Sequence, residues 1–308
     1  MTKSVIMPLE SFRLKQYAVP IPCYVCETDN TFDAEFCIYC AAPMALAHQA
    51  NSQDLRPRTI AVVGASGAGK TVYLGMLMDM LSRQTERMQF LARGAFSITL
   101  QQTTVAALAR CEFPHKTPNE PDRWNWVHCQ VRRGKHQRQP TELIMPDMAG
   151  EALLEEVDHP HTYRIIRAFL KKCTAAMVLI DAVRLSEGVR EQDFFTLKLL
   201  SYLSELNEGR KEGWSNRPVA MIFTKADQVD ECVDDPAAYA QRHASGLWQQ
   251  CRERFNRHKF FAAGVAGACA ARDSLTEGRT QVPLRIEPHG VIEPFEWLLD
   301  NLVPHKER

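Results

Sequence analysis

The chain has 308 residues with 37 basic and 37 acidic side chains, so its formal net charge at neutral pH is zero. This balance disfavours a broad nucleic-acid-binding surface, because neutralising phosphates requires an excess of Lys and Arg. A hydrophobic fraction of 45% is typical of a globular protein. The N-terminus carries no signal-peptide pattern, the longest apolar run (175–180) is too short to cross a bilayer, and six scattered cysteines suit a reducing compartment. We therefore expect a cytoplasmic protein without a membrane segment.

The first predicted element is a small metal-binding module. Two Cys-x-x-Cys pairs can place four thiolates around one tetrahedral ion, with the intervening chain folded as a hairpin. So short a segment buries too little apolar surface to fold alone, and Zn²⁺ would supply the missing free energy. An iron site, a redox dithiol pair and a degenerate site are the alternatives. We expect a structural zinc ribbon over 1–45, a linker over 46–57, and metal ligation by Cys23, Cys26, Cys37 and Cys40. A docking surface for a partner protein is the functional interpretation of this module, and the sequence leaves it open.

A phosphate-binding loop follows a β-rich run at 59–63. The next eight residues match G-x-x-x-x-G-K-[ST] at every defined position, and 72–81 favours a helix. The glycines let the loop wrap closely around phosphate, while backbone N–H groups and the helix N-terminus face the anion. Lys70 is expected to reach the β- and γ-phosphates and Thr71 to bind Mg²⁺. The predicted nucleotide-binding residues of this loop are Gly64, Ala65, Ser66, Gly67, Ala68, Gly69, Lys70 and Thr71.

Two later segments indicate the type of nucleotide. Asp147 and Gly150 form a D-x-x-G motif at the end of a predicted strand, where Asp147 is expected to hold Mg²⁺ through water and the Gly150 N–H to contact the γ-phosphate. After the strand at 219–223, residues Thr224, Lys225 and Asp227 resemble the T-K-x-D guanine motif. The Asp227 carboxylate would accept hydrogen bonds from guanine N1–H and the exocyclic amine. Adenine lacks both donors, and a buried carboxylate left unpaired is costly.

Two further positions complete the expected site. Thr117 precedes the predicted strand at 124–133, and we expect it to close over the γ-phosphate and to contact Mg²⁺. After the strand at 259–263, GTPases carry a Ser-Ala pair whose backbone N–H reaches guanine O6. This chain has Gly264 and Val265 there. A backbone contact stays open to these residues, but the departure makes base selectivity less secure.

The three motifs in this order resemble the translation-factor-related (TRAFAC) class of GTPases with a Ras-like core. More narrowly, the chain resembles the bacterial double-GTPase family, whose members occur in gene clusters linked to biological conflict and signalling. The resemblance covers about 58–303 and includes PHGVIEPFEWLL at 288–299, which looks like that family's closing helix. It implies an α/β domain over 58–308 with a doubly wound, mostly parallel sheet and the nucleotide at the carboxyl ends of the strands. Strands are predicted at 59–63, 124–133, 141–147, 175–181, 217–223 and 259–263, and helices at 70–83, 97–110, 151–171, 190–207, 236–257 and 293–302, with a helical insert at about 84–116.

Glu151 stands where Ras-like enzymes carry a water-orienting Gln. Its charge would repel the γ-phosphate, so hydrolysis is expected to be slow or to need a partner's arginine; Arg93 and Arg110 are internal candidates. The sequence thus predicts a GTP-hydrolysing molecular switch that uses GTP or GDP, Mg²⁺ and Zn²⁺ and signals to a protein effector or activator. A nucleotide-binding scaffold with negligible hydrolysis and an ATP-using P-loop enzyme are the alternatives, and the oligomeric state stays open. The residues expected at the reacting phosphate are Lys70, Thr117, Gly150 and Glu151.

Overall fold

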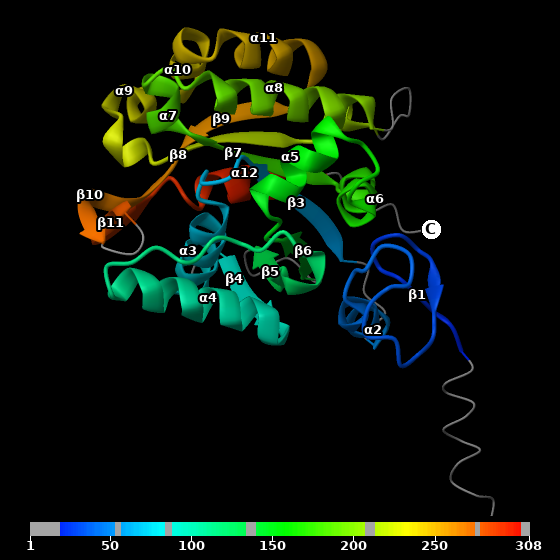
Figure 1. Ribbon diagram of the computed structural model, residues 1–308. Helices are drawn as coiled ribbons and strands as arrows, with labels where there is room; N and C mark the ends of the chain where they lie inside the picture. Colours follow the sequence, from blue (N-terminus) through cyan, green and yellow to red (C-terminus); the bar gives the residue numbers. More distant parts are fainter. Residues whose placement is uncertain are drawn as a thin grey trace, which may run out of the picture.

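The computed structural model describes residues 19–52, 57–83, 88–133, 140–206, 213–274 and 278–302. A seven-stranded sheet in the order β4-β5-β6-β3-β7-β8-β9 forms its centre (Figure 1). Only β5 runs antiparallel to its neighbours, and all other neighbouring strands are parallel. The predicted doubly wound, mostly parallel sheet is therefore confirmed. The strands are β3 (Arg58–Gly64), β4 (Met88–Arg93), β5 (Trp126–Arg133), β6 (Thr141–Pro146), β7 (Ala175–Asp181), β8 (Val219–Thr224) and β9 (His258–Ala262).

The central strands β3, β7 and β8 are mostly apolar and almost wholly buried, because both faces of the sheet are covered. In β3, Ile60 and Val62 face one hydrophobic cluster, while Ala61 and Val63 face the other. One face carries α3 (Lys70–Arg83), α4 (Gly94–Ala109) and α12 (Glu293–Asn301). The opposite face carries α5 (Gly150–Asp158), α6 (Arg164–Lys172), α8 (Arg190–Glu205), α10 (Pro236–His243) and α11 (Ser245–Arg254). Short α7 (Ala182–Ser186) and α9 (Asp230–Asp234) follow β7 and β8.

Several predicted boundaries differ from the structure. The described part of the insert is not wholly helical, because β4 adds an edge strand to β5 before α4 begins. The helix predicted at 151–171 is two helices, and a turn separates them where the buried Glu156 carboxylate accepts hydrogen bonds from the backbone N–H of His161 and of Tyr163. The helix predicted at 236–257 is likewise divided at Ala244. Residues 134–139, where we expect a hairpin turn between the strands predicted at 124–133 and 141–147, lie outside the described residues.

A long hairpin was not predicted. Strands β10 (Gly264–Ser274) and β11 (Gly278–His289) pair with each other and form a separate two-stranded sheet. The hairpin follows β9 directly and projects from the body of the domain next to α9 (Figure 1). Its first residue is at the position where a short base-binding loop was expected.

The N-terminal module packs against the α/β domain rather than standing apart. It comprises β1 (Ile21–Pro22), β2 (Asp29–Asn30) and α2 (Met44–Ser52), so the expected linker at 46–57 begins inside a helix; residues 1–18 lie outside the described chain. Its apolar side chains join the same hydrophobic cluster as Trp126 and Phe169. The Lys172 ammonium lies 4.2 Å from the centre of the Tyr24 ring. Gln49 Oε1 lies 2.9 Å from Nδ1 of the buried His128 on β5.

Among the helices that the structure describes, none combines the length and apolar character needed to cross a membrane.

Candidate nucleotide site and cysteine cluster

The phosphate-binding loop joins the carboxyl end of β3 to the first turn of α3. Gly67 and Gly69 have φ angles of +79° and +81°, in the left-handed region that glycine adopts without a steric penalty. The buried Lys70 ammonium donates to the backbone oxygens of Gly64 (2.9 Å) and Ala65 (3.0 Å). Burial lowers the pKa of Lys70 to about 8. The loop therefore surrounds a desolvated cation at the point where the sequence predicts phosphate.

Three oxygen-bearing side chains from separate segments meet beside this loop. Asp147 Oδ2 accepts hydrogen bonds from Thr71 Oγ1 at 2.9 Å and from Thr117 Oγ1 at 3.0 Å, and the two hydroxyls are 3.1 Å apart. The other carboxylate oxygen, Asp147 Oδ1, is buried and has no hydrogen-bond partner among the described residues. Burial raises the pKa of Asp147, while nearby Lys70 acts in the opposite direction. Hydroxyl and carboxylate oxygens with one unused lone-pair site form a donor set that fits Mg²⁺.

The start of α5 presses against the phosphate-binding loop. A Cβ atom on Gly150 would lie 2.4 Å from the backbone nitrogen of Ser66, so only glycine fits this approach. Glu151 accepts hydrogen bonds from Ser66 Oγ (3.2 Å) and Asn119 Nδ2 (3.4 Å), and its Oε1 lies 3.7 Å from the ammonium of Lys116. Glu151 thus links the phosphate-binding loop to the segment that carries Thr117.

The T-K-x-D segment follows β8 at the other end of the site. Thr224 Oγ1 donates to the backbone oxygen of Ala68 at 2.9 Å, which ties the segment to the phosphate-binding loop. Lys225 has a φ of +57°, and its ammonium forms an ion pair with the buried carboxylate of Asp181. Asp227 Oδ2 is buried without a hydrogen-bond partner among the described residues, and burial raises the pKa of this carboxyl group. A base edge with two N–H donors would satisfy it.

The positions predicted to contact guanine O6 begin the hairpin. Gly264 is the first residue of β10, and a Cβ atom there would lie 2.6 Å from Asp227 Oδ1 and 2.9 Å from His289 Nε2. The next residue, Val265, lines the same cavity as Asp227. The structure therefore places both positions beside the carboxylate, on a strand rather than on a free loop.

One cavity of about 700 Å³ connects the phosphate end to the base end. Its walls include Lys70, Thr71, Thr117, Glu151 and Asp227, and its volume falls within the usual range for small-molecule sites.

Asp181 and Arg184 are among the lining residues that were not predicted from the sequence. Asp181 ends the buried strand β7, and a carboxylate directly after an apolar run near two other motif strands was the available signal.

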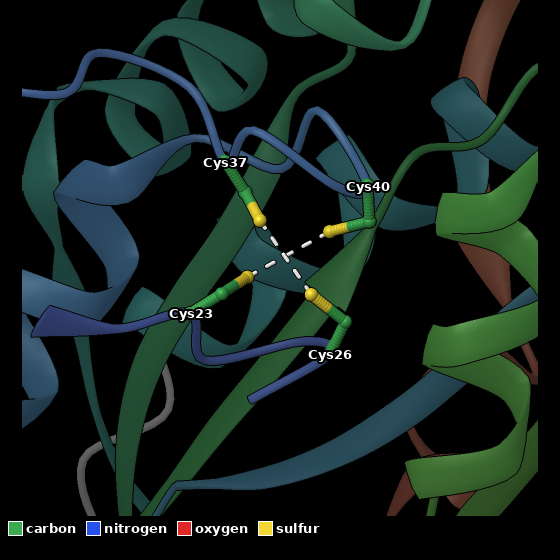
Figure 2. A group of neighbouring side chains, drawn as sticks. All are labelled: Cys23, Cys26, Cys37 and Cys40. Atoms are coloured by element: carbon green, nitrogen blue, oxygen red, sulfur yellow. Dashed lines mark hydrogen bonds between the residues drawn. The ribbon is translucent and has the colours of Figure 1, made fainter. Parts of the chain in front are cut away.

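The four predicted cysteines converge into one cluster (Figure 2). All four sulfur atoms lie within 4.8 Å of one another; Cys23 and Cys40 are 3.7 Å apart, and Cys26 and Cys37 are 3.5 Å apart. Four Zn–S bonds of about 2.3 Å in a tetrahedron would place the sulfur atoms about 3.8 Å apart. The side chains therefore lie close to the arrangement of a four-thiolate zinc site.

Hydrogen bonds within and around the cluster orient the sulfur atoms. The hydrogen bond between Cys23 and Cys40 lowers the pKa of Cys23 and raises that of Cys40, because one proton lies between the two sulfur atoms. The backbone N–H of Val25 lies 3.3 Å from Cys23 Sγ, and that of Tyr39 lies 3.4 Å from Cys37 Sγ. Such N–H donors to sulfur fix the orientation of metal-binding thiolates.

A phosphate-binding loop, an adjoining D-x-x-G segment and a T-K-x-D segment around one cavity define a P-loop protein of the GTPase class. Within that class, residues 58–269 match the family model described as Double-GTPase 2, and the chain belongs to this family. The family assignment confirms the resemblance inferred from the motifs and supports GTP binding. No curated protein sequence matches the chain.

The solved structures that match the chain have low sequence identity to it. Nucleolar GTP-binding protein 1 from Plasmodium falciparum is 14% identical with a TM-score of 0.41, over 80% of this chain and 86% of that one. The Ski7 GTPase-like domain of S. cerevisiae bound to GDP and inorganic phosphate is 14% identical with a TM-score of 0.39, over 68% of this chain. The GTP-bound Ski7 domain is 14% identical with a TM-score of 0.41, over 68% of this chain. The match spans only 43% and 42% of the two Ski7 chains.

Proposed function

We propose that this chain binds GTP with Mg²⁺ in the described cavity, hydrolyses it to GDP and acts as a molecular switch. The observation that carries the proposal is the meeting of Thr71, Thr117 and Asp147. These residues come from α3, from the segment before β5 and from the position directly after β6, so three separate segments bring oxygen atoms to one point beside the phosphate-binding loop. Family membership supports the GTP-binding part of the proposal.

Each end of the cavity has a defined task. Thr71, Thr117 and Asp147 hold Mg²⁺, which neutralises phosphate charge when bound. Lys70 adds a second positive charge at the β- and γ-phosphates. Asp227 selects guanine, because its buried Oδ2 gains a donor from guanine and would stay unpaired beside adenine.

The switch consists of the two segments that flank the γ-phosphate. Thr117 and the Gly150–Glu151 pair lie on different segments, and Glu151 contacts the Thr117 segment through Asn119 and the phosphate-binding loop through Ser66. GTP orders both segments, and loss of the γ-phosphate releases them. A protein effector binds the ordered, GTP-bound state and not the GDP-bound state.

We place this activity in the cytoplasm, and the family resemblance suggests a bacterial conflict or defence system. Zn²⁺ in the four-cysteine cluster holds the N-terminal module together.

A second candidate is a nucleotide-binding scaffold with negligible hydrolysis. The contacts of Glu151 favour this alternative, because its two carboxylate oxygens already accept hydrogen bonds from Ser66 and Asn119, and the Lys116 ammonium lies 3.7 Å from Oε1. A carboxylate held in this way repels the γ-phosphate and is not free to orient water. The same contacts predict that intrinsic hydrolysis, where present, is slow.

Single-turnover hydrolysis by excess full-length protein separates the two candidates. A switch converts bound GTP to GDP with a rate that Lys70→Ala abolishes, either through binding or through turnover. A scaffold leaves the bound GTP intact over hours, and that result would refute the hydrolytic part of the proposal. Arg252→Ala serves as a control, because Arg252 packs on Trp248 in α11 and does not line the cavity.

A further inference from the structure

The cavity contains an arginine that the sequence motifs do not single out. Arg184 lies on α7, immediately after β7, and is the only arginine among the described residues that line the cavity. The internal candidates named from the sequence lie elsewhere. Arg93 approaches Glu142 at 3.7 Å, and Arg110 pairs with Glu112 at 3.3 Å. Neither Arg93 nor Arg110 lines the cavity.

The guanidinium of Arg184 lies against the phosphate-binding loop. A Cβ atom built on Gly67 would be 3.6 Å from Arg184 Nη2 and 4.0 Å from its Cζ. Because the backbone N–H groups of this loop face bound phosphate, a guanidinium at Gly67 sits at the edge of the phosphate cradle. The planar guanidinium pairs well with phosphate oxygens and keeps its charge at every physiological pH.

Asp181 holds Arg184 in place without consuming its outer donors. Asp181 Oδ1 accepts the backbone N–H of Arg184 at 3.2 Å, and Asp181 Oδ2 lies 3.8 Å from Arg184 Nε. The second contact is an ion pair whose N···O distance is too long for a hydrogen bond. The Asp181 carboxylate also pairs with Lys225 and is almost wholly buried, whereas the Arg184 side chain is 47% exposed. The charge is therefore oriented toward the loop, while its terminal nitrogens remain accessible to a ligand.

We propose that Arg184 is an internal arginine finger whose guanidinium contacts the β- and γ-phosphate oxygens of bound GTP. In hydrolysis, the oxygen of a water molecule attacks the γ-phosphorus. The bond to the β–γ bridging oxygen breaks, its electron pair goes to that oxygen on GDP, and the water proton ends on the released inorganic phosphate. Arg184 neutralises the charge that moves onto the β-phosphate. This inference rests on the proposed GTP hydrolysis and replaces the partner arginine expected from the sequence.

The test compares Arg184→Ala and Arg184→Lys with the full-length chain in two assays. The first is single-turnover hydrolysis, for which an arginine finger is worth on the order of 10³ to 10⁵ in rate. The second is the affinity for fluorescent GDP with and without aluminium fluoride, which mimics the transferring phosphoryl group. We expect both variants to keep GDP affinity within a fewfold, to lose the fluoride-dependent gain in affinity, and to hydrolyse GTP at least 100-fold more slowly. Arg252→Ala should match the wild type in both assays.

The outcomes are distinct. An unchanged fluoride effect and rate in Arg184→Ala would overturn the proposal. Loss of GDP affinity in Arg184→Lys, which keeps the charge beside Asp181, would also overturn it in favour of a structural role for that ion pair. A wild-type protein that neither hydrolyses GTP nor responds to fluoride fails before the variants are compared, and that failure rejects the proposed hydrolysis itself.

Discussion

Replacing Gly150 with alanine tests the contact between the D-x-x-G segment and the phosphate-binding loop. The added Cβ would lie 2.4 Å from Ser66 N and 2.8 Å from Ser66 Cα, both backbone atoms that cannot rotate away. Relieving such overpacking typically costs about 1–3 kcal/mol. The shift also displaces the Gly150 N–H, and a hydrogen bond to a charged group contributes about 1.5–3 kcal/mol.

GTP uses the Gly150 N–H in our account, whereas GDP lacks the γ-phosphate that it contacts. We therefore expect Gly150→Ala to lower the ratio of GTP affinity to GDP affinity by about 10- to 100-fold, since each 1.4 kcal/mol corresponds to a factor of ten. Calorimetric titration of both nucleotides in the presence of Mg²⁺ measures this ratio directly.

Gly75→Ala is a matched control for overpacking. A Cβ atom at Gly75 would lie 2.2 Å from Thr104 Oγ1, between α3 and α4, and Gly75 does not line the cavity. This variant should lower Tm without changing the ratio of the two affinities. If Gly150→Ala likewise lowers Tm but leaves the ratio unchanged, Gly150 does not sense the γ-phosphate and our reasoning about this contact is wrong.

Three further predictions follow from the same site and from the cysteine cluster. GTP binding should take up protons at pH 8.5 but not at pH 6.5, because burial lowers the pKa of Lys70 to about 8 and bound phosphate raises it again. Calorimetry in buffers of different ionisation enthalpy measures this uptake, and equal binding heats in all buffers at pH 8.5 would contradict it. Glu151→Gln should leave GDP affinity intact and raise the single-turnover rate, and an unchanged rate would show that Glu151 does not limit hydrolysis. Elemental analysis should find one zinc per chain that Cys23→Ser with Cys40→Ser removes; because the module shares a hydrophobic cluster with the α/β domain, zinc loss should also lower the Tm of the whole chain, and an unchanged Tm would mean that the module is energetically separate.

The sequence predicted those parts of the site that depend on short contiguous patterns. The phosphate-binding loop and the two Cys-x-x-Cys pairs are local, because a few neighbouring residues determine both the backbone conformation and the ligand chemistry. Thr117 belongs to no such pattern and was selected by its position before β5. The structure brings its hydroxyl to Asp147, although its role at Mg²⁺ remains a proposal.

The parts that were not predicted depend on contacts between distant segments. Arg184 reaches the phosphate-binding loop only because β3 and β7 are neighbours, and no spacing in the sequence reveals this. In α2, Leu46 and Ala50 are buried by packing against other segments of the chain. The local sequence does not show those segments, so the short helix was interpreted as a linker. The two hairpin strands pair only with each other and lie outside the central sheet. The sequence of β10 is rich in alanine and glycine and lacks the apolar pattern of a core strand, so the strand was not predicted.

Base selection by Asp227 tests the central claim most directly. Calorimetry of the full-length protein with GDP and ADP should give a GDP affinity at least about 100-fold higher, because only guanine satisfies the buried Asp227 Oδ2. Asp227→Asn should weaken GDP binding and shift the preference toward xanthosine diphosphate, whose O2 can accept from the amide. Equal affinities for GDP and ADP in the unmodified protein would contradict the assignment of this cavity to a guanine nucleotide.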